Sequence, residues 1–304
     1  MSGSPVVVLA GGTGGAKLAR GMEDVVGEDL VVVANTADDL EIYGAHVSPD
    51  PDLVSFWLAD RIDERGWGLA GDTFQVMDGL RELGVEVWFN LGDRDLAIGL
   101  DRARRLAGGE RLTETIAALG RSLGLRGRVL PMSDEPVRTW VRAQGRLWPF
   151  QAFMIQARGE GPVEGVELRG VQSARPTAEV LEAVARARAI ILGPSNPVIS
   201  IGPILALPGM REALAASDAP VVAVSPLVGG RVLKGPTEPF LAWSGHGLHS
   251  DGIAAAYAGV IDGLLADEPT SRVAHRRADV LMADGAGRRR VAAEALDFAG
   301  ALAG

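Results

Sequence analysis

The chain has 304 residues, of which 47% are hydrophobic, with no cysteine and a formal net charge of −9. This composition excludes a disordered chain, disulfides and cysteine chemistry, and it argues against a nucleic-acid partner because an acidic surface repels phosphates. No apolar run is long enough to span a bilayer, and the N-terminus lacks the basic region of a signal peptide, so we expect a cytoplasmic protein without membrane contact.

Short apolar runs at residues 6–9 and 30–34 predict buried strands, with a helix between them at residues 17–26. A strand–helix–strand unit of this kind builds a parallel sheet. Further strands are expected at 128–130, 189–192 and 221–224, and helices at 53–60, 72–83, 95–107, 112–123, 172–188, 251–265 and 288–302. We predict one α/β domain over residues 1–304: a doubly wound, mostly parallel, Rossmann-like sheet with helical and hairpin insertions around 95–125 and 136–170.

The first candidate site follows the first strand, where four glycines stand within residues 11–15. Glycines let backbone amides approach a phosphate at a helix N-terminus, and four exceed the needs of a plain turn, which is the alternative. The segment is not a P-loop, because Leu18 replaces Ser or Thr, and Lys17 stands where a dinucleotide fingerprint has its third glycine. The ligand-binding candidates are Gly12, Thr13, Gly14, Gly15 and Lys17.

Acidic residues follow the second strand, which ends in Asn35 rather than in the acid that would hold a ribose. Asp38 and Asp39 are adjacent at the carboxyl end of this strand, which suits a magnesium ion, although such residues also favour helix caps and turns. Asp52, in the motif Ser48–Asp52, fits the first turn of a helix equally well. Only its nearness in sequence to Asp38 suggests a shared acidic pocket.

Two more polar loops carry weaker signals. In residues 90–95, Arg94 could clamp a phosphate and Asp93 could cap the following helix. Residues 225–236 follow the strand at 221–224, and Gly229 lies there beside two basic residues, so its amide could meet an anion. The alternative for this segment is a mobile surface loop.

The most informative segment is residues 193–205, directly after the strand at 189–192. Three prolines make it stiff, and Ser195, Asn196 and Ser200 offer polar side chains to a ligand. Open α/β sheets bind their ligands at the carboxyl ends of the strands. Several glycine- and serine-rich loops at such ends favour one common ligand face.

Together these loops resemble the 2-phospho-L-lactate transferase family of coenzyme F-420 biosynthesis. The resemblance runs from residue 6 to about 265 in the family's order and spacing, and its most specific part is the segment 193–205. It is carried by Gly11–Leu18, Asn35–Asp39, Ser48–Asp52, Leu91–Asp95, Leu130–Asp134, Gly193–Leu205 and Val222–Gly230.

The resemblance implies a transferase that joins a phosphorylated three-carbon acid to the ribityl side chain of the deazaflavin Fo. The donor would be a guanosine diphosphate ester of the acid, and GMP would leave. Such phosphoryl transfer depends on positioning and charge neutralisation. Family members need magnesium and are commonly dimeric, so Mg²⁺ and a homodimer are expected. The residues leave the choice among phospholactate, phosphoenolpyruvate and phosphoglycerate open.

The resemblance also assigns roles to single residues. Asp52 matches the acid that contacts Fo in the family. Asp38, Asp39 and Asp52 could hold the magnesium ion that the family needs, with Asp38 and Asp52 as the candidate ligands and Asp38 and Asp39 as the catalytic candidates, although the sequence does not decide which aspartates bind the metal. Asn90 stands where archaeal members have a basic residue that contacts Fo. The guanosine phosphate end of the donor would meet Ser195, Asn196 and Ser200.

The sequence also suggests two alternative functions. A related branch of the superfamily binds a UDP-sugar and regulates without chemistry, but there the aspartate pair tends to be followed by Gly and Ser, whereas residues 40–44 here are closer to the transferases. A nicotinamide dehydrogenase is disfavoured by Lys17 and Asn35.

Overall fold

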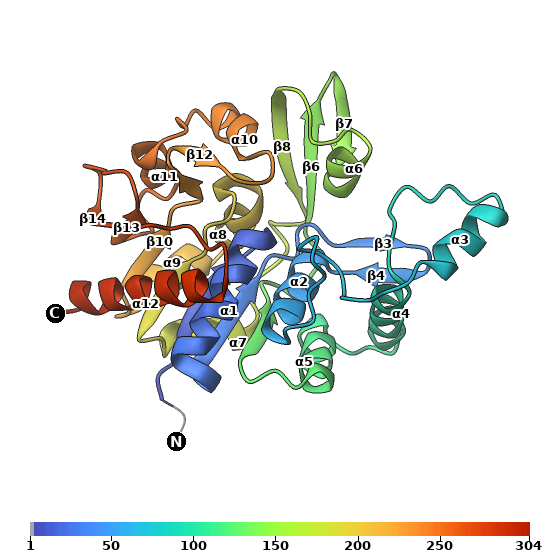
Figure 1. The fold of residues 1–304 in the computed structure, drawn as a ribbon, viewed down its shortest axis with the longest axis horizontal. Coiled ribbons are helices and arrows are strands. Elements are labelled where there is room, and N and C mark those ends of the chain that lie inside the picture. The colour runs from blue at the N-terminus through green and yellow to red at the C-terminus, as the bar shows by residue number, and fades with distance from the viewer. Residues whose placement is uncertain (1–2) are drawn as a thin grey trace.

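A computed structural model describes residues 3–304, and its centre is a seven-stranded parallel sheet (Figure 1). The strands are β1 (Val6–Ala10), β2 (Leu30–Ala34), β5 (Arg128–Pro131), β9 (Ala189–Leu192), β10 (Val221–Val224), β13 (Gly263–Ala266) and β14 (Ala274–Arg277). β1, β2, β9, β10 and β13 are buried throughout, as expected when helices cover both faces of a parallel sheet. The predicted doubly wound α/β fold is confirmed.

The order in which the chain adds strands to the sheet reverses beside β1. The spatial order is β14-β13-β10-β9-β1-β2-β5, so the chain runs outward from β1 to β2 and β5, then returns to β9 on the other side of β1. In open α/β sheets the crevice at such a switch point, outside the carboxyl ends of the strands, is where ligands bind. In this protein, the segments that follow β1 and β9 meet at this crevice.

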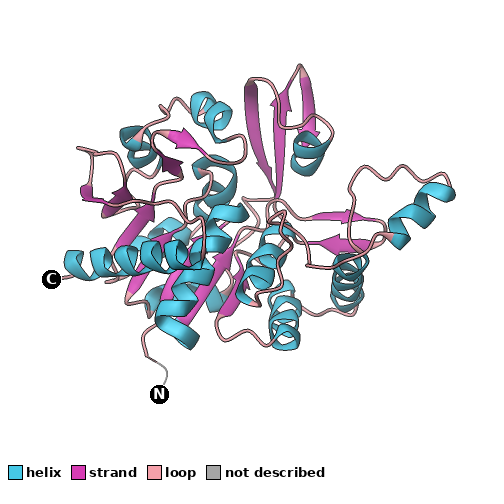
Figure 2. Cartoon of the chain, viewed as in Figure 1, coloured by secondary structure: helices cyan, strands magenta, loops and turns pink. Residues whose placement is uncertain are grey.

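Alternate residues of the strands other than β14 enter two separate cores, one on each face of the sheet. One face packs on α1 (Gly12–Val26), α2 (Pro49–Leu58), α5 (Leu112–Leu123) and α12 (Gly285–Leu302); the other packs on α7 (Ala178–Ala185), α8 (Gly202–Ala206), α9 (Met210–Ala215) and α11 (Ser250–Ala256) (Figure 2). The short helical turn η1 (Gly27–Asp29) connects α1 to β2. The π-helical turn η2 (Pro197–Ile201) connects β9 to α8. None of the helices in residues 3–304 has the length and hydropathy needed to cross a membrane.

Three smaller parts extend from this body (Figure 1). The arm consists of β3 (Leu40–Ile42), β4 (Ala45–Val47), α3 (Gln75–Glu82) and α4 (Asp93–Ala107), which share an apolar cluster around Met77. An antiparallel sheet contains β6 (Arg138–Ala143), β7 (Arg146–Pro149) and β8 (Val163–Arg169), with α6 (Phe150–Ile155) after β7. The hairpin of β11 (Leu227–Val228) and β12 (Arg231–Val232) precedes α10 (Thr237–Trp243). The hairpins and short helix expected within 136–170 are confirmed.

Several predicted elements were wrong in extent. The helix expected at 53–60 is α2, which begins at Pro49 and ends at Leu58. The glycine segment after β1 is the first turn of α1 rather than a loop. The helix expected at 172–188 begins only after Thr177, whose hydroxyl accepts a hydrogen bond from the Val180 amide and so sets the N-cap. The helix expected at 251–265 is α11, which ends at Ala256, and residues 263–266 form the strand β13 instead.

Candidate active site

The glycines after β1 allow helix α1 to pack directly on the segment after β9. A Cβ added to Gly14 would lie 2.0 Å from the Pro194 carbonyl oxygen, and one on Gly15 would lie 2.8 Å from the Ser195 Oγ. No larger side chain fits without moving backbone. Gly14 and Gly15 therefore have a packing role that the sequence did not reveal. Gly12 differs, because its φ is +62° and nothing would lie within 4 Å of its Cβ.

Asp50 links the start of α1 to the end of β2. Its Oδ1 accepts a hydrogen bond from the Gly12 amide at 2.6 Å, and its Oδ2 accepts one from the Asn35 Nδ2 at 3.0 Å. The Asn35 Nδ2 also lies 3.5 Å from the Ile199 carbonyl oxygen, in η2. Burial raises the pKa of Asp50 to about 6, against these two hydrogen bonds. Segments after β1, β2 and β9 thus converge on one buried carboxylate.

Asp38 and Asp39 lie beside this carboxylate and are almost fully buried. The Oδ1 atom of each has no hydrogen-bond partner in the described residues. Burial raises the pKa of both groups, and for Asp38 the nearby charges of Asp50 and Asp39 raise it further. Buried polar atoms without partners are rare in folded proteins and call for an ion, water or ligand. We name the group of Gly12, Asn35, Asp38, Asp39, Asp50 and Asn196 the cradle.

The second oxygen of Asp39 is anchored. Its Oδ2 accepts a hydrogen bond from the Ser48 hydroxyl at 2.7 Å and lies 3.1 Å from the His46 Nε2. The His46 Nδ1 lies 3.3 Å from Glu41, which also accepts a hydrogen bond from Arg138. Burial opposes charge on this imidazole, but its bonds to the two carboxylates raise the pKa of His46 to about 9.

Asp52 is held by Arg102 of α4 rather than left free. Both guanidinium Nη atoms donate to its carboxylate in a bidentate, buried ion pair, and Arg102 also donates to the His46 carbonyl oxygen at 3.1 Å. Such a pair satisfies the charge of Asp52 within the protein. The sequence motif contained both Asp50 and Asp52, and the structure makes Asp50 the acid that joins the cradle.

The segment after β9 presents its polar side chains in two ways. The Asn196 Oδ1 accepts hydrogen bonds from the amides of Val198 and Ile199 and so caps η2, whereas its Nδ2 is buried without a partner. The Ser195 Oγ accepts from the Gly11 amide at 3.4 Å. Ser200 lies against Gly11, whose added Cβ would be 2.6 Å from the serine Cβ. The Asn196 Nδ2 is therefore a buried donor that has no partner within the described residues.

Lys17 lies one turn into α1, on the side that faces α2 and α12. Its Nζ lies 3.4 Å from the Met282 carbonyl oxygen and 5.8 Å from the Trp57 ring centre. Partial burial, then the charges of Lys234 and Arg288, lower the pKa of Lys17. This basic group suits an anion near the start of α1. Thr13 is half-buried on the first turn of the same helix.

Within residues 3–304, none of three predicted ligand residues forms a hydrogen bond with the cradle. Asn90 is exposed on the arm and accepts a hydrogen bond from Arg81, and Arg94 is exposed on α4. The Gly229 amide donates to Asp267 at 2.5 Å, so a neighbouring carboxylate already occupies the donor that was expected to meet an anion.

The acids around Arg94 cap helices. Asp72 accepts hydrogen bonds from the amides of Arg94 and Asp95 at the start of α4, while Asp93 accepts from the amides of Gln75 and Val76 at the start of α3. Asp93 was expected to cap the helix that follows it, and that prediction was wrong: it caps α3 instead. The two acids cap each other's helices, which gives the loop at 90–95 a structural function.

The cradle fits magnesium in a limited sense. In residues 3–304 no group of three or more His, Cys, Asp or Glu side chains is placed to hold a metal ion. Magnesium is usually bound through one or two carboxylates together with substrate phosphates, and it prefers hard oxygen ligands. The unpartnered Asp38 Oδ1 beside Asp50 supplies that kind of ligand.

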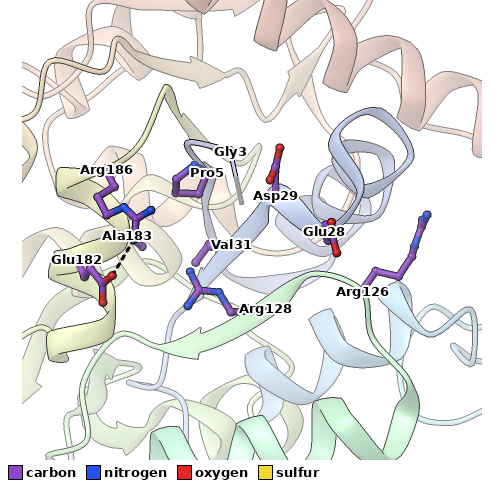
Figure 3. A pocket seen from close by; sticks show the side chains of 10 residues that line it. All are labelled: Gly3, Pro5, Glu28, Asp29, Val31, Arg126, Arg128, Glu182, Ala183 and Arg186. Atoms are coloured by element: carbon purple, nitrogen blue, oxygen red, sulfur yellow. Dashed lines mark hydrogen bonds and ion pairs between the residues drawn. The ribbon is translucent and has the colours of Figure 1, made fainter. Parts of the chain in front are cut away.

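A hollow in the surface lies at another edge of the sheet. Its volume is about 500 Å³, and it opens at the amino ends of β1, β2 and β5, the edge of the sheet opposite the cradle. Figure 3 shows charged side chains around it, with Arg186 paired to Glu182 on α7. The other charged residues of its lining are Glu28, Asp29, Arg126 and Arg128.

Known proteins place the chain in a family. Residues 6–296 match the model of the family described as 2-phospho-L-lactate transferase CofD. The chain is 41% identical over 265 residues to a 2-phospho-L-lactate transferase of Methanosarcina mazei (86% of this chain, 87% of that protein) and 42% identical over 271 residues to a phosphoenolpyruvate transferase of Kitasatospora aureofaciens (86% and 84%).

Solved structures agree on the fold. A crystal structure of a Bacillus halodurans protein superposes with a TM-score of 0.57 at 20% identity, covering 90% of this chain and 88% of that one. At this identity the likeness extends to the fold alone. The match over residues 6–296 and the two close relatives decide the family. The chain is a transferase enzyme that belongs to the 2-phospho-L-lactate transferase CofD family of coenzyme F-420 biosynthesis.

Proposed function

We propose that this enzyme transfers a phosphorylated three-carbon acid from a guanosine diphosphate ester to the deazaflavin Fo and releases GMP. The relatives named above are a 2-phospho-L-lactate transferase and a phosphoenolpyruvate transferase, which differ in the acid. The observation that carries the proposal is the pair of buried, unpartnered Oδ1 atoms of Asp38 and Asp39 at the switch point of the sheet. Such atoms suit a reaction centre that a substrate completes.

The transfer needs one bond made and one broken at phosphorus. The ribityl hydroxyl oxygen of Fo forms a bond to the phosphorus that carries the acid, and the bond from that phosphorus to the GMP oxygen breaks, with its electron pair leaving on GMP. We assign the hydroxyl proton to the free Oδ1 of Asp39, because this oxygen is buried and has no partner to compete. Positioning of the two substrates then supplies most of the rate enhancement.

We assign magnesium to Asp38, with Asp50 as its neighbour in the cradle. The ion would neutralise the charge of the diphosphate. An acidic protein with few bases near the cradle has no other means of neutralising that charge. Asp52 was expected to be the second ligand. Its carboxylate instead holds Arg102, and a carboxylate already neutralised by a guanidinium has less to offer a second cation.

The two substrates occupy different sides of the cradle in this proposal. The unused Asn196 Nδ2 and the basic Lys17 suit the phosphates of the guanosine donor. Asp52 remains the proposed Fo contact, through lone pairs that Arg102 leaves available. The Asn90 amide would reach Fo only if the arm approaches the cradle. We also propose that the enzyme is a homodimer.

The decisive experiment is mass analysis of the product formed from Fo, magnesium and each guanosine diphosphate ester in turn. We expect a phosphodiester of Fo and one of the three acids, with GMP released in equal amount. Binding titrations with Fo, a UDP-sugar and NAD serve as the control. Tight UDP-sugar binding without Fo binding or product would replace the transferase proposal with a regulatory one.

A further inference from the structure

Asp39 is held at one oxygen only. Two donors, the Ser48 hydroxyl at 2.7 Å and the His46 Nε2 at 3.1 Å, converge on Oδ2, while the buried Oδ1 has no partner. The terminal torsion of an aspartate is broad, so a carboxylate without such anchors samples many orientations. Anchoring of Oδ2 by two groups from different positions fixes that torsion and therefore the direction of Oδ1.

The imidazole that supplies one anchor is itself fixed from the other side. Glu41 and His46 stand directly opposite each other in the β3–β4 hairpin, so their side chains share one face. The Glu41 carboxylate lies 3.3 Å from the His46 Nδ1 and accepts a 2.7 Å hydrogen bond from Arg138 of β6. A neutral imidazole donates at one nitrogen only, so two carboxylates at its two nitrogens match the protonated ring.

We infer that His46, together with Ser48, is a positioning residue that directs the Asp39 Oδ1 toward the attacking hydroxyl of the acceptor. The inference rests on the proposed function, in which Asp39 takes the hydroxyl proton. His46 touches neither substrate in this scheme. It acts through Asp39, and the Arg138–Glu41 pair keeps its ring in register with that carboxylate.

The experiment that tests this inference compares kcat and the KM for Fo of two His46 variants. A displacement of about 1 Å in a reacting group can lower turnover by about 10²-fold, so we expect His46→Ala to lower kcat by about 10- to 100-fold with little change in KM for Fo. His46→Gln keeps an N–H that can donate to Asp39, and we expect it to recover much of the loss. His275→Ala, in β14 at the far edge of the sheet, is the control and should leave kcat unchanged.

A double-mutant cycle separates positioning from a merely structural contribution. If His46 acts through Asp39, then His46→Ala should change kcat little in an Asp39→Asn background. An equal loss of kcat in both backgrounds would overturn the inference, as would a raised KM for Fo with unchanged kcat. If His46→Ala fails to fold by circular dichroism, Ser48→Ala removes the other anchor and undergoes the same cycle with the same expectation.

The wild-type assay keeps this inference distinct from the proposed function. Absence of any Fo product from the unmodified enzyme would remove the proposed reaction itself. Normal Fo product together with unimpaired kcat in both His46→Ala and Ser48→Ala would leave the reaction in place and overturn the positioning role alone.

Discussion

The two edges of the central sheet differ in how their polar groups are satisfied. At the amino edge, a hollow of about 500 Å³ is lined by exposed charges that meet water or each other, as Arg186 meets Glu182 (Figure 3). At the carboxyl edge, the cradle contains buried atoms of Asp38, Asp39 and Asn196 that have no partner in the described residues. Empty volume marks the first edge, and unmet hydrogen-bonding capacity marks the second.

This difference is the reason for which we place the proposed site at the carboxyl edge. A solvated hollow carries no free-energy cost that a ligand would relieve, whereas a buried polar group without a partner costs about 1–3 kcal/mol. Such groups are rare in folded proteins, and a water, an ion or a ligand can satisfy them.

The largest effect, a loss of stability, is expected from a side chain added where α1 packs on the segment after β9, at the carboxyl edge of the sheet. The Cβ of Gly14→Ala would lie 2.0 Å from the Pro194 carbonyl oxygen, which is backbone that has no rotamer to escape into. Overpacking costs about 1–3 kcal/mol where side chains adjust, and we expect at least that loss in the free energy of unfolding by urea. Gly300→Ala in α12 is the control: its Cβ meets nothing within 4 Å, so a gain of about 0.5–1 kcal/mol is expected.

The next effect concerns turnover at the cradle. Asp38→Asn should lower kcat by about 10²-fold and change KM for Fo much less, because its proposed role is to stabilise charge in the transition state. Asp29→Asn removes an acid from the amino-edge hollow and should leave kcat unchanged. Steady-state kinetics at saturating magnesium checks both, and wild-type turnover by Asp38→Asn there would take Asp38 out of the mechanism.

Asn196 tests the nucleotide side of the cradle. Asn196→Ala and Asn196→Asp both remove the buried Nδ2 donor, so we expect each to raise KM for the guanosine donor by about tenfold, the value of a hydrogen bond to a charged group. Only Asn196→Ala also loses the η2 cap, which should cost about 1 kcal/mol of stability. An equal rise in KM for Fo would show that the two substrate sides are reversed.

The same Asp38 carboxyl should oppose folding when no metal is bound. Burial raises its pKa in the folded chain, so ionisation costs more free energy folded than unfolded. This penalty is absent below the unfolded pKa of about 3.9, grows as pH rises and is largest at alkaline pH. Asp38→Asn should therefore raise Tm at pH 8 in EDTA by about 2 °C or more, and by less at pH 5. A larger gain at pH 5 would contradict the assignment.

The smallest effect is expected at the amino edge. Arg128 lines the hollow there and is exposed, so Arg128→Ala should change the KM of either substrate by less than about twofold. A selective change in one KM would mean that the hollow contributes to binding, and the comparison between the edges would have to be redrawn.

Much of the architecture was predictable because it follows from local patterns. Continuous apolar runs predicted β1, β2, β9 and β10, and polar loops after them predicted the ligand edge. The pairing of Asp52 with Arg102 was not predictable, since it depends on where α4 packs, 50 residues along the chain. The choice between Asp50 and Asp52 likewise needed the orientation of the first turn of α2.

The β3–β4 hairpin explains another omission. His46 carries no recognisable motif, and only the cross-strand register places it beside Asp39. α11 ends at Ala256, earlier than predicted, and Gly259, three residues beyond it, has a left-handed φ that a continued helix would not allow. Side-chain partners and helix ends are therefore the features that the sequence predicted least well.

The exchanged caps of α3 and α4 join two helices that are separated by a long loop. Asp72 precedes α3 yet serves α4, and Asp93 opens α4 yet serves α3. Neither helix can fray at its start without releasing the acid that secures the other. The two caps therefore couple the helices of the arm, and we expect both helices to open together in hydrogen exchange as one cooperative unit. Evolution could lengthen the loop between them without loosening either helix.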